Sequence, residues 1–250
     1  MLVAFCVAFD AKPSAALEAL KVFRGALILE GKIEPGDYIS VRNFLRIESN
    51  FKKISGGVFL ASPGGYVVEA MKIGNLIRSL QLSTDAPSIP PPEKRIGTPI
   101  IRSTDLVNAR HYECVSACFL LYAAGVDRQL IAAGRLGLHQ PRSLRVETSG
   151  VTAASLGVRN EIRDYLARMN VPERYVELMY SIPVSEVRWI TQQEFENDLK
   201  GYIPELGALI KEKCKTYESP GQVGEMRQCA ADIRAKLSEA AWRALFQSNH

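Results

Sequence analysis

This chain has little histidine and no paired cysteine motif. Among its 250 residues, histidine occurs three times and cysteine five times. None of the cysteines has the paired spacing of a structural zinc site, and histidine is too scarce to complete a ligand set. We therefore predict that the protein holds no metal, and the sequence indicates no other cofactor.

Long apolar runs and basic stripes are also missing. No run approaches the ~18–20 apolar residues that a membrane-crossing helix needs, so we predict no transmembrane helix. The net charge is only +4, and the basic residues are not interleaved with aromatic ones, so nucleic acid is not an expected partner. With 47% hydrophobic and 23% charged residues, the composition is that of a globular protein with a sizeable core.

The N-terminus has two open interpretations. Residues 1–11 are apolar and end in small residues, like the hydrophobic and cleavage regions of a secretory signal, but the positively charged start of such a signal is missing. The segment is either the remnant of an export signal whose start lies upstream, or an ordinary first strand or helix. The first interpretation predicts a periplasmic or otherwise exported protein, with membrane proximity during export, and the second is compatible with the cytoplasm.

Two pairs of cysteines are placed so that they could form disulfides. Cys214 and Cys229 lie in a region of helical pattern near the C-terminus, where they could join two helices. Cys114 and Cys118 bracket Ser116 and could also pair in an oxidising compartment. The alternative is that all are buried thiols, which pack as small hydrophobic side chains.

Residues 57–80 give the clearest structural signal. Residues 57–61 read as a buried strand, residues 62–65 (Ser-Pro-Gly-Gly) as a tight turn, and residues 66–80 as an amphipathic helix. Strand, turn and helix form a βα unit, and repeated units of this kind imply an α/β fold with a mostly parallel sheet.

The remaining sequence patterns predict further strands and helices, with a weaker periodicity of apolar residues. Strands are expected at residues 26–33, 129–134, 136–139 and 187–191. Helices are expected at residues 12–24 (a weak signal), 37–54, 155–169, 173–180 and 192–198, and over most of residues 202–250 with a break at 219–221. The proline-rich stretch within residues 85–108 reads as a loop insertion, before a strand at 100–101 or 106–107.

Three short stretches together suggest a catalytic site. Gly64 and Gly65 form a turn that lets a backbone N–H point above the sheet. Ser116 opens a helix after Cys114, and His139 ends a short strand. Taken singly, the glycines are a plain turn and the serine is a helix cap. Taken together, they supply an oxyanion site, a nucleophile and a base, which are the parts that acyl transfer needs.

These stretches resemble the ClpP/crotonase superfamily, and within it the ClpP-like serine peptidases rather than the acyl-CoA hydratases. The resemblance covers roughly residues 26–202 and rests on residues 62–65, on Ser116-Ala117, on residues 138–141 and on residues 189–195. The Cys-x-Ser-Ala-Cys form is similar to a branch of uncharacterised bacterial proteins, many of them periplasmic. The resemblance implies repeated ββα and βα units with a helical C-terminal tail.

We accordingly divide the chain into three parts. Residues 1–25 form an N-terminal segment, residues 26–203 a ClpP-like α/β domain, and residues 204–250 a helical extension. Because proteins of this family form oligomers, the resemblance implies a homo-oligomer. The helical extension would cover either a neighbouring subunit or the chain's own core.

Carried over to this chain, the resemblance assigns specific roles. Ser116 would attack a peptide carbonyl and His139 would take its proton. The backbone N–H groups of Gly65 and Ala117 would hold the oxyanion.

The resemblance also predicts a peptide or protein substrate. Gly64, Gln140 and Pro141 would line its groove, where a peptide binds as an added strand. An exposed turn with no ligand is an equally good interpretation of Gln140 and Pro141.

The third member of the site is where the chain departs from the family. ClpP-like peptidases carry an aspartate at the position that Val187 occupies here. Glu186, one residue earlier, is the nearest carboxylate and can orient a histidine as an aspartate does. Asp164, a bare Ser–His dyad or an inactive site are the alternatives.

Three functional hypotheses follow. The first is a serine peptidase, that is, a hydrolase with a Ser-His(-Glu) site. The second is a catalytically inactive binding or assembly module, with Val187 marking the lost acid. The third is a crotonase-type acyl-CoA enzyme, which needs the two oxyanion donors but not the pairing of Ser116 with His139.

Overall fold

The structure is a computed structural model. It describes residues 17–87, 113–131, 135–141, 153–214 and 222–247 of the chain. Every structural statement below refers to these residues.

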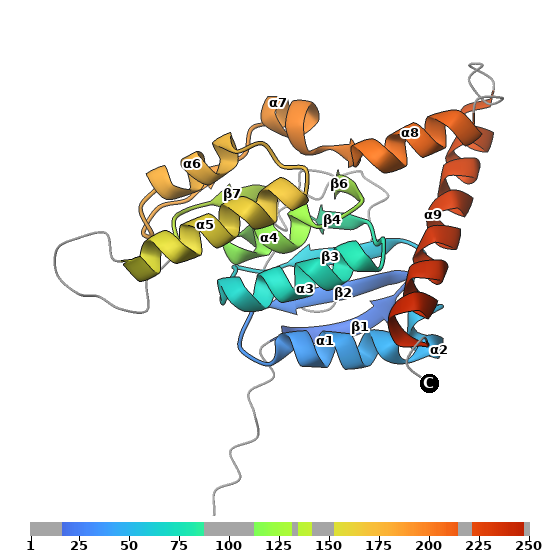
Figure 1. The fold of residues 1–250 in the computed structure, drawn as a ribbon, viewed down its shortest axis with the longest axis horizontal. Coiled ribbons are helices and arrows are strands. Elements are labelled where there is room, and N and C mark those ends of the chain that lie inside the picture. Colours follow the sequence, from blue (N-terminus) through green and yellow to red (C-terminus); the bar gives the residue numbers. More distant parts are fainter. Residues whose placement is uncertain (1–16, 88–112, 132–134, 142–152, 215–221, 248–250) are drawn as a thin grey trace, which may run out of the picture.

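The fold is α/β, built on a larger and a smaller β-sheet (Figure 1). The larger sheet has the strand order β1-β2-β3-β4-β6-β9. Its strands are β1 (Leu17–Phe23), β2 (Ala26–Gly31), β3 (Gly57–Ala61), β4 (Thr84–Pro87), β6 (Asp127–Ile131) and β9 (Gly201–Tyr202). The four central strands run parallel, and β1 and β9 pair antiparallel at the two edges. The predicted α/β class with a mostly parallel sheet is therefore confirmed.

The smaller sheet has the order β5-β7-β8. Its strands are β5 (Cys114–Val115), β7 (Leu136–Leu138) and β8 (Arg188–Trp189). β5 pairs parallel with β7, and β8 pairs antiparallel with β7. An isolated bridge between Ser62 and Cys114 connects this sheet to the chain just after β3.

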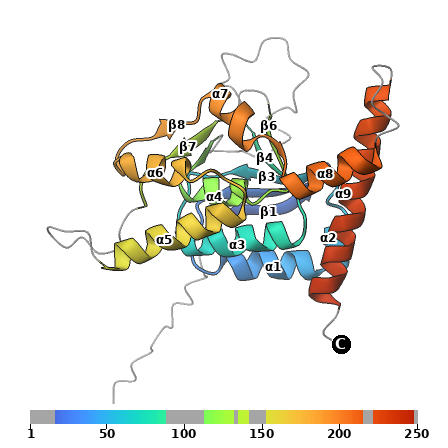
Figure 2. The same cartoon turned by 45° about the horizontal axis from the view of Figure 1, so that its top comes forward.

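Helices α1, α3 and α4 pack next to one another on one face of the larger sheet (Figures 1 and 2). The helices are α1 (Asp37–Arg46), α2 (Glu48–Phe51), α3 (Val67–Ser79), α4 (Ala117–Ala123), α5 (Ala153–Arg168), α6 (Arg174–Ser181), α7 (Gln192–Glu194), the π-helix η2 (Phe195–Leu199), α8 (Pro204–Lys213) and α9 (Val223–Phe246). All seven residues of α4 are buried, which places this helix in the centre of the molecule.

The burial of each element follows from its sequence pattern. All six residues of β2 are buried, as expected of a parallel strand covered on both faces. Helix α3 buries Ala70, Ile73, Leu76 and Ile77, whose spacing places them on one face of the helix. The strand predicted at residues 57–61 and the helix predicted at 66–80 are confirmed by β3 and α3.

The helix expected at residues 12–24 is wrong, because Leu17–Phe23 is strand β1. Arg24 and Gly25 connect β1 to β2 and both have positive φ, 48° and 81°. Two central residues with positive φ form the tight turn that matches the twist of a β-hairpin. The apolar residues of this segment have a weakly helical spacing, but the hydrogen-bonded pairing with β2 outweighs it. The predicted boundary between residues 25 and 26 falls within the hairpin.

Several other predictions differ in detail. The helix expected at 37–54 is broken at Ile47, whose backbone is extended. The strand expected at 129–134 is β6, which begins two residues earlier. The loop expected at 85–108 begins later, because β4 continues to Pro87. Residues 1–11, and the strand expected at 100–101 or 106–107, lie outside the described residues.

Helix α9 closes the amino ends of the parallel strands (Figure 1). Arg234 donates to Asp127 Oδ2 at 3.0 Å and to Ser83 Oγ at 2.7 Å, at the starts of β6 and β4. Trp242 Nε1 donates to the Leu45 carbonyl at 2.7 Å. Its ring stacks on Phe51, with centroids 5.7 Å apart. The opposite, carboxyl ends of the strands are not involved in these contacts.

Both cysteine pairs form disulfides. Cys214 bridges to Cys229 and joins the end of α8 to α9. Cys114 bridges to Cys118 across the start of α4. The alternative that these four residues are buried thiols is therefore wrong. No helix in the described part of the chain is long and apolar enough to cross a membrane.

A buried carboxyl on β4 makes the stability of this fold depend on pH. Asp85 is 9% exposed, and burial raises its pKa from 3.8 to about 7. The carboxylate of Asp127 also raises the pKa of Asp85, and Arg234 lowers it. The folded state thus binds this proton more tightly than the unfolded state. The resulting stability is fully present below pH 3.8 and is lost as the pH rises to about 7.

We expect Asp85→Asn to stabilise the protein at pH 8 and to leave it nearly unchanged at pH 4, because asparagine carries no charge to desolvate. The gain in the free energy of unfolding at pH 8 should be a few kcal/mol at most, since one pKa unit corresponds to about 1.4 kcal/mol. Urea denaturation across this pH range measures it. The exposed Asp232→Asn is the control, and a difference between wild type and Asp85→Asn that does not change with pH would contradict the prediction.

Candidate active site

The predicted site residues follow strands whose carboxyl ends meet at one edge. Val115 of β5 pairs in parallel with Gly137 of β7, and the Ser116 N–H donates to the Gly137 carbonyl at 2.9 Å. Ser116 directly follows β5, and His139 directly follows β7. Because the carboxyl ends of parallel neighbours lie at the same edge, the fold brings the serine and the histidine to one place.

The glycine turn after β3 is fixed by backbone pairing with Ile33. The Ile33 N–H donates to the Gly64 carbonyl at 2.8 Å, and the Tyr66 N–H donates to the Ile33 carbonyl at 2.9 Å. Gly64 and Gly65 have φ of 95° and 146°. A Cβ on Gly65 would lie 2.0 Å from the Ile33 oxygen, so no other residue fits without breaking this pairing.

The same turn lies directly against Ser116. A Cβ on Gly64 would lie 2.7 Å from Ser116 Cβ and 3.0 Å from the Ala117 nitrogen. The structure thus brings together Gly64, Gly65, Ser116 and Ala117. Within the described residues, the N–H groups of Gly65 and Ala117 donate to no acceptor. Two free donors beside a serine are the arrangement that an oxyanion requires.

Ser62 shapes the glycine turn. Its Oγ accepts a hydrogen bond from the Gly64 N–H at 3.0 Å, and its side chain is buried. A serine hydroxyl that binds the backbone two residues ahead stabilises a turn. This role was not predicted, although a serine two residues before a glycine is a usable sequence signal.

Ser116 has an unusual backbone conformation. Its φ is 59° and its ψ is −125°, in the turn between β5 and α4. Such a conformation costs about 1–3 kcal/mol for a residue other than glycine. Its side chain makes no capping hydrogen bond to α4. The interpretation of Ser116 as an ordinary helix cap is therefore wrong. The residue is half-buried.

His139 is held by a backbone carbonyl. Its Nδ1 lies 2.8 Å from the Gln140 oxygen. A carbonyl only accepts hydrogen bonds, so Nδ1 carries the proton and Nε2 is the free base in the neutral ring. The Gln140 N–H donates to the Ile182 carbonyl at 2.9 Å, which fixes this part of the backbone. Pro141 follows, half-buried. The role of the Gln140 carbonyl had no sequence signal, because every residue has one.

Val187 and Glu186 directly precede strand β8. This strand pairs antiparallel with β7, Gly137 with Trp189 and Leu138 with Arg188. The side chain of Val187 lies on the face of Gly137, 2.6 Å from where a Cβ on Gly137 would be. Glu186 lies in the turn before β8, where its N–H donates to the Pro183 carbonyl at 2.9 Å. Glu186 is exposed, and its role as third member stays a prediction.

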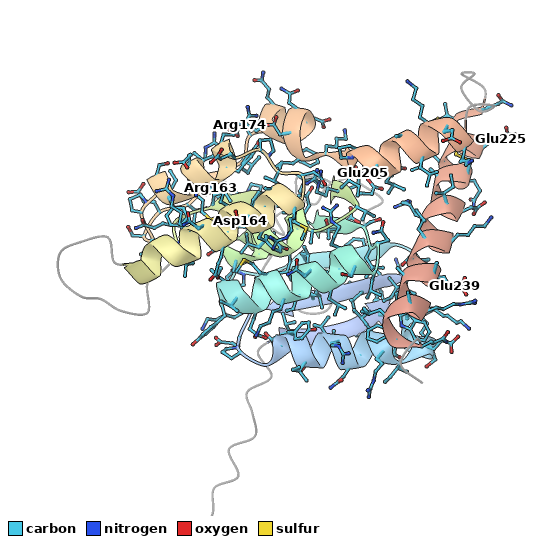
Figure 3. The ribbon with its side chains drawn as sticks, viewed as in Figure 1. Arg163, Asp164, Arg174, Glu205, Glu225 and Glu239 are labelled. Atoms are coloured by element: carbon cyan, nitrogen blue, oxygen red, sulfur yellow. A yellow bond between two sulfur atoms is a disulfide. The ribbon has the colours of Figure 1, made fainter. Side chains whose placement is uncertain are left out.

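The remaining candidates are Asp164 and the other two histidines. Asp164 is exposed on α5 (Figure 3). His111 and His250 lie outside the described residues. Among the described residues, no group of three or more histidine, cysteine, aspartate or glutamate side chains could hold a metal ion.

The comparisons with known proteins give a fold-level likeness only. No protein-family model matches the chain, and no curated protein matches it in sequence. Among solved structures, the chain is similar to a point mutant of ClpP1 from Listeria monocytogenes. The two are 14% identical with a TM-score of 0.45, and the match covers 70% of this chain and 86% of that one.

The contact between Gly65 and Ile33 predicts a severe effect of Gly65→Ala. The added methyl would meet the Ile33 oxygen, and residue 65 would keep a φ of 146° that alanine rarely adopts. We expect the free energy of unfolding to fall by about 2–4 kcal/mol. Gly157→Ala in α5 is the control, because a Cβ there meets nothing within 4 Å, and it should stabilise the helix by about 0.5–1 kcal/mol. Equal unfolding midpoints in urea for the two variants would contradict the prediction.

Proposed function

We propose that this protein is a serine hydrolase that cleaves peptide bonds, with Ser116 as nucleophile and His139 as base. The observation that carries the proposal is the turn at Ser116. Its backbone is strained, its hydroxyl does not cap the helix that it heads, and the N–H groups of the adjoining Ala117 and of Gly65 in the neighbouring turn find no acceptor among the described residues. A sharp strand-to-helix turn of this kind is how hydrolases expose a nucleophilic serine.

The proposed reaction begins at the serine hydroxyl. Ser116 Oγ attacks the carbonyl carbon of the peptide, and His139 Nε2 takes the proton from Oγ. The oxygen of the resulting tetrahedral intermediate accepts hydrogen bonds from the Gly65 and Ala117 N–H groups. His139 then gives its proton to the leaving amine as the C–N bond breaks. Water, activated by the same histidine, hydrolyses the acyl-enzyme and restores Ser116.

The Gln140 carbonyl takes part in this scheme as an orienting group. It accepts the hydrogen bond from His139 Nδ1, so it selects the tautomer whose Nε2 is free. In this proposal it occupies the role that an aspartate has in a complete triad. Gly64, Gln140 and Pro141 are proposed to line the groove for an extended peptide or protein substrate.

Two disulfides support an oxidising compartment, since cytosolic thiols are normally kept reduced. We therefore propose an exported, periplasmic location. Assembly into a homo-oligomer stays a prediction from the family resemblance.

The second candidate is an inactive binding or assembly module of the same fold. It is favoured by Val187, which stands at the position where the resemblance places the acid of the site. Among the described residues, Ser116 Oγ and His139 also form no hydrogen bond. Catalytic hydrogen bonds are often long in the absence of substrate, so this geometry does not decide between the two candidates.

Labelling by a serine-reactive fluorophosphonate separates the two candidates. We expect wild-type protein to be labelled, and both Ser116→Ala and His139→Ala to lose labelling, because the hydroxyl needs a base to become reactive. Ser185→Ala removes an exposed serine and is the control, which should be labelled like wild type. Absence of labelling in folded wild-type protein would favour the binding module.

The contact of His139 with the Gln140 carbonyl leads to a second expectation. We expect Glu186→Gln to be labelled at nearly the wild-type rate, because a backbone carbonyl already holds Nδ1 of His139. Loss of a true orienting carboxylate lowers the rate by about 10⁴-fold in serine proteases. Val187→Asp introduces an acid at the position where the resemblance places one, and it should increase the labelling rate. If Glu186→Gln loses labelling as His139→Ala does, Glu186 is the third member after all.

A further inference from the structure

We infer that the disulfide between Cys114 and Cys118 is a positioning element for the nucleophile. It joins the residue two before Ser116 to the residue two after it. Cys114 belongs to strand β5 and Cys118 to the first turn of α4, so the bond spans the strand-to-helix turn. The inference rests on the proposed function of Ser116 as nucleophile.

The turn needs such a constraint because its conformation is unfavourable by itself. Ser116 has a positive φ of 59°, and a strained residue persists only where its surroundings hold it. Backbone hydrogen bonds hold the strand side, from Val115 to the Ser62 carbonyl and from Ser116 to the Gly137 carbonyl. On the helix side, the Phe119 N–H donates to the Ser116 carbonyl at 2.9 Å. The disulfide adds a covalent connection across both sides.

The position of the bond fits a structural constraint rather than a redox switch. Both cysteines are fully buried and belong to the main hydrophobic core. Thiol exchange requires access of an attacking thiolate to the sulfur, which burial prevents in the folded state. The bond is therefore expected to persist through the life of the folded protein and to hold Ser116 continuously.

The second disulfide provides a matched comparison. Cys214–Cys229 joins residues 15 apart and connects α8 to α9, whereas Cys114–Cys118 joins residues only 4 apart. A disulfide that closes a longer loop constrains the unfolded chain more. The 214–229 bond should therefore contribute more to global stability, and the 114–118 bond should contribute more to the reactivity of Ser116.

The experiment compares Cys114→Ala/Cys118→Ala with Cys214→Ala/Cys229→Ala. Each variant is labelled with fluorophosphonate at a temperature well below its own melting temperature. We expect the first to be labelled roughly 10- to 100-fold more slowly than wild type, as is typical for a misplaced reacting group. The second should lose more thermal stability and keep the wild-type labelling rate. Equal labelling rates for the two double variants would overturn the inference.

Single variants separate the covalent constraint from simple packing. Cys114→Ala and Cys118→Ala each break the bond completely, so each should be labelled as slowly as the double variant. If the sulfurs matter only as core packing, each single variant, which keeps one sulfur, should instead be labelled faster than the double variant. Faster labelling of the single variants would therefore also overturn the inference.

Amide hydrogen exchange tests the constraint without relying on catalysis. In Cys114→Ala/Cys118→Ala, the peptide covering residues 113–123 should exchange faster than in wild type, with little change in α9. If wild-type protein is not labelled but this local change appears, the disulfide holds the turn and the peptidase proposal fails. If exchange in this peptide is unchanged, the disulfide is not a positioning element, whatever the labelling shows.

Discussion

The candidate site depends on a continuous series of backbone hydrogen bonds through the turn after β3. On one side, Ile33 pairs with Gly64 and Tyr66, and on the other, Ser62 pairs with Glu113 and Val115. The series continues from Ser116 to Gly137. Because these contacts are between backbone atoms, they fix the glycine turn and Ser116 relative to one another without any side chain that could change rotamer. Glycine at positions 64 and 65 is the condition for this close approach, since a side chain on either would separate the strands.

The contacts of α9 and the strained turn at Ser116 lie at opposite ends of the strands. At the amino ends, α9 is fixed by the ion pair of Arg234 with Asp127 and by the packing of Trp242 on Phe51. At the carboxyl end of β5, Ser116 has a positive φ although it is not a glycine. Ligand sites of open parallel sheets lie at the carboxyl ends of their strands. The strained turn is thus tolerated because the contacts of α9 and the core hold the fold together.

The sequence predicted those elements whose pattern is strong and local. Residues 57–61 and 66–80 have clear strand and helix periodicity, and both were confirmed with small changes of boundary. The hairpin at Arg24 and Gly25 was missed because pairing with the adjacent apolar strand β2 overrides a weak helical recurrence. The pairing of β8 with β7 depends on strand register, and the contact of His139 with the Gln140 carbonyl depends on backbone geometry. Neither feature can be predicted from the residue types in the sequence.

The choice of serine at position 116 is difficult to explain by structure alone. A residue with φ of 59° is most easily a glycine, which would remove strain of about 1–3 kcal/mol. A serine that capped α4 would contribute about 1 kcal/mol, but this one makes no capping bond. Serine therefore gains neither advantage here, and its side chain must be favoured for another reason. A half-buried serine near the N–H groups of Gly65 and Ala117, which find no acceptor among the described residues, is consistent with nucleophilic chemistry. A disulfide centred on that residue would then oppose its relaxation to an ordinary helix cap.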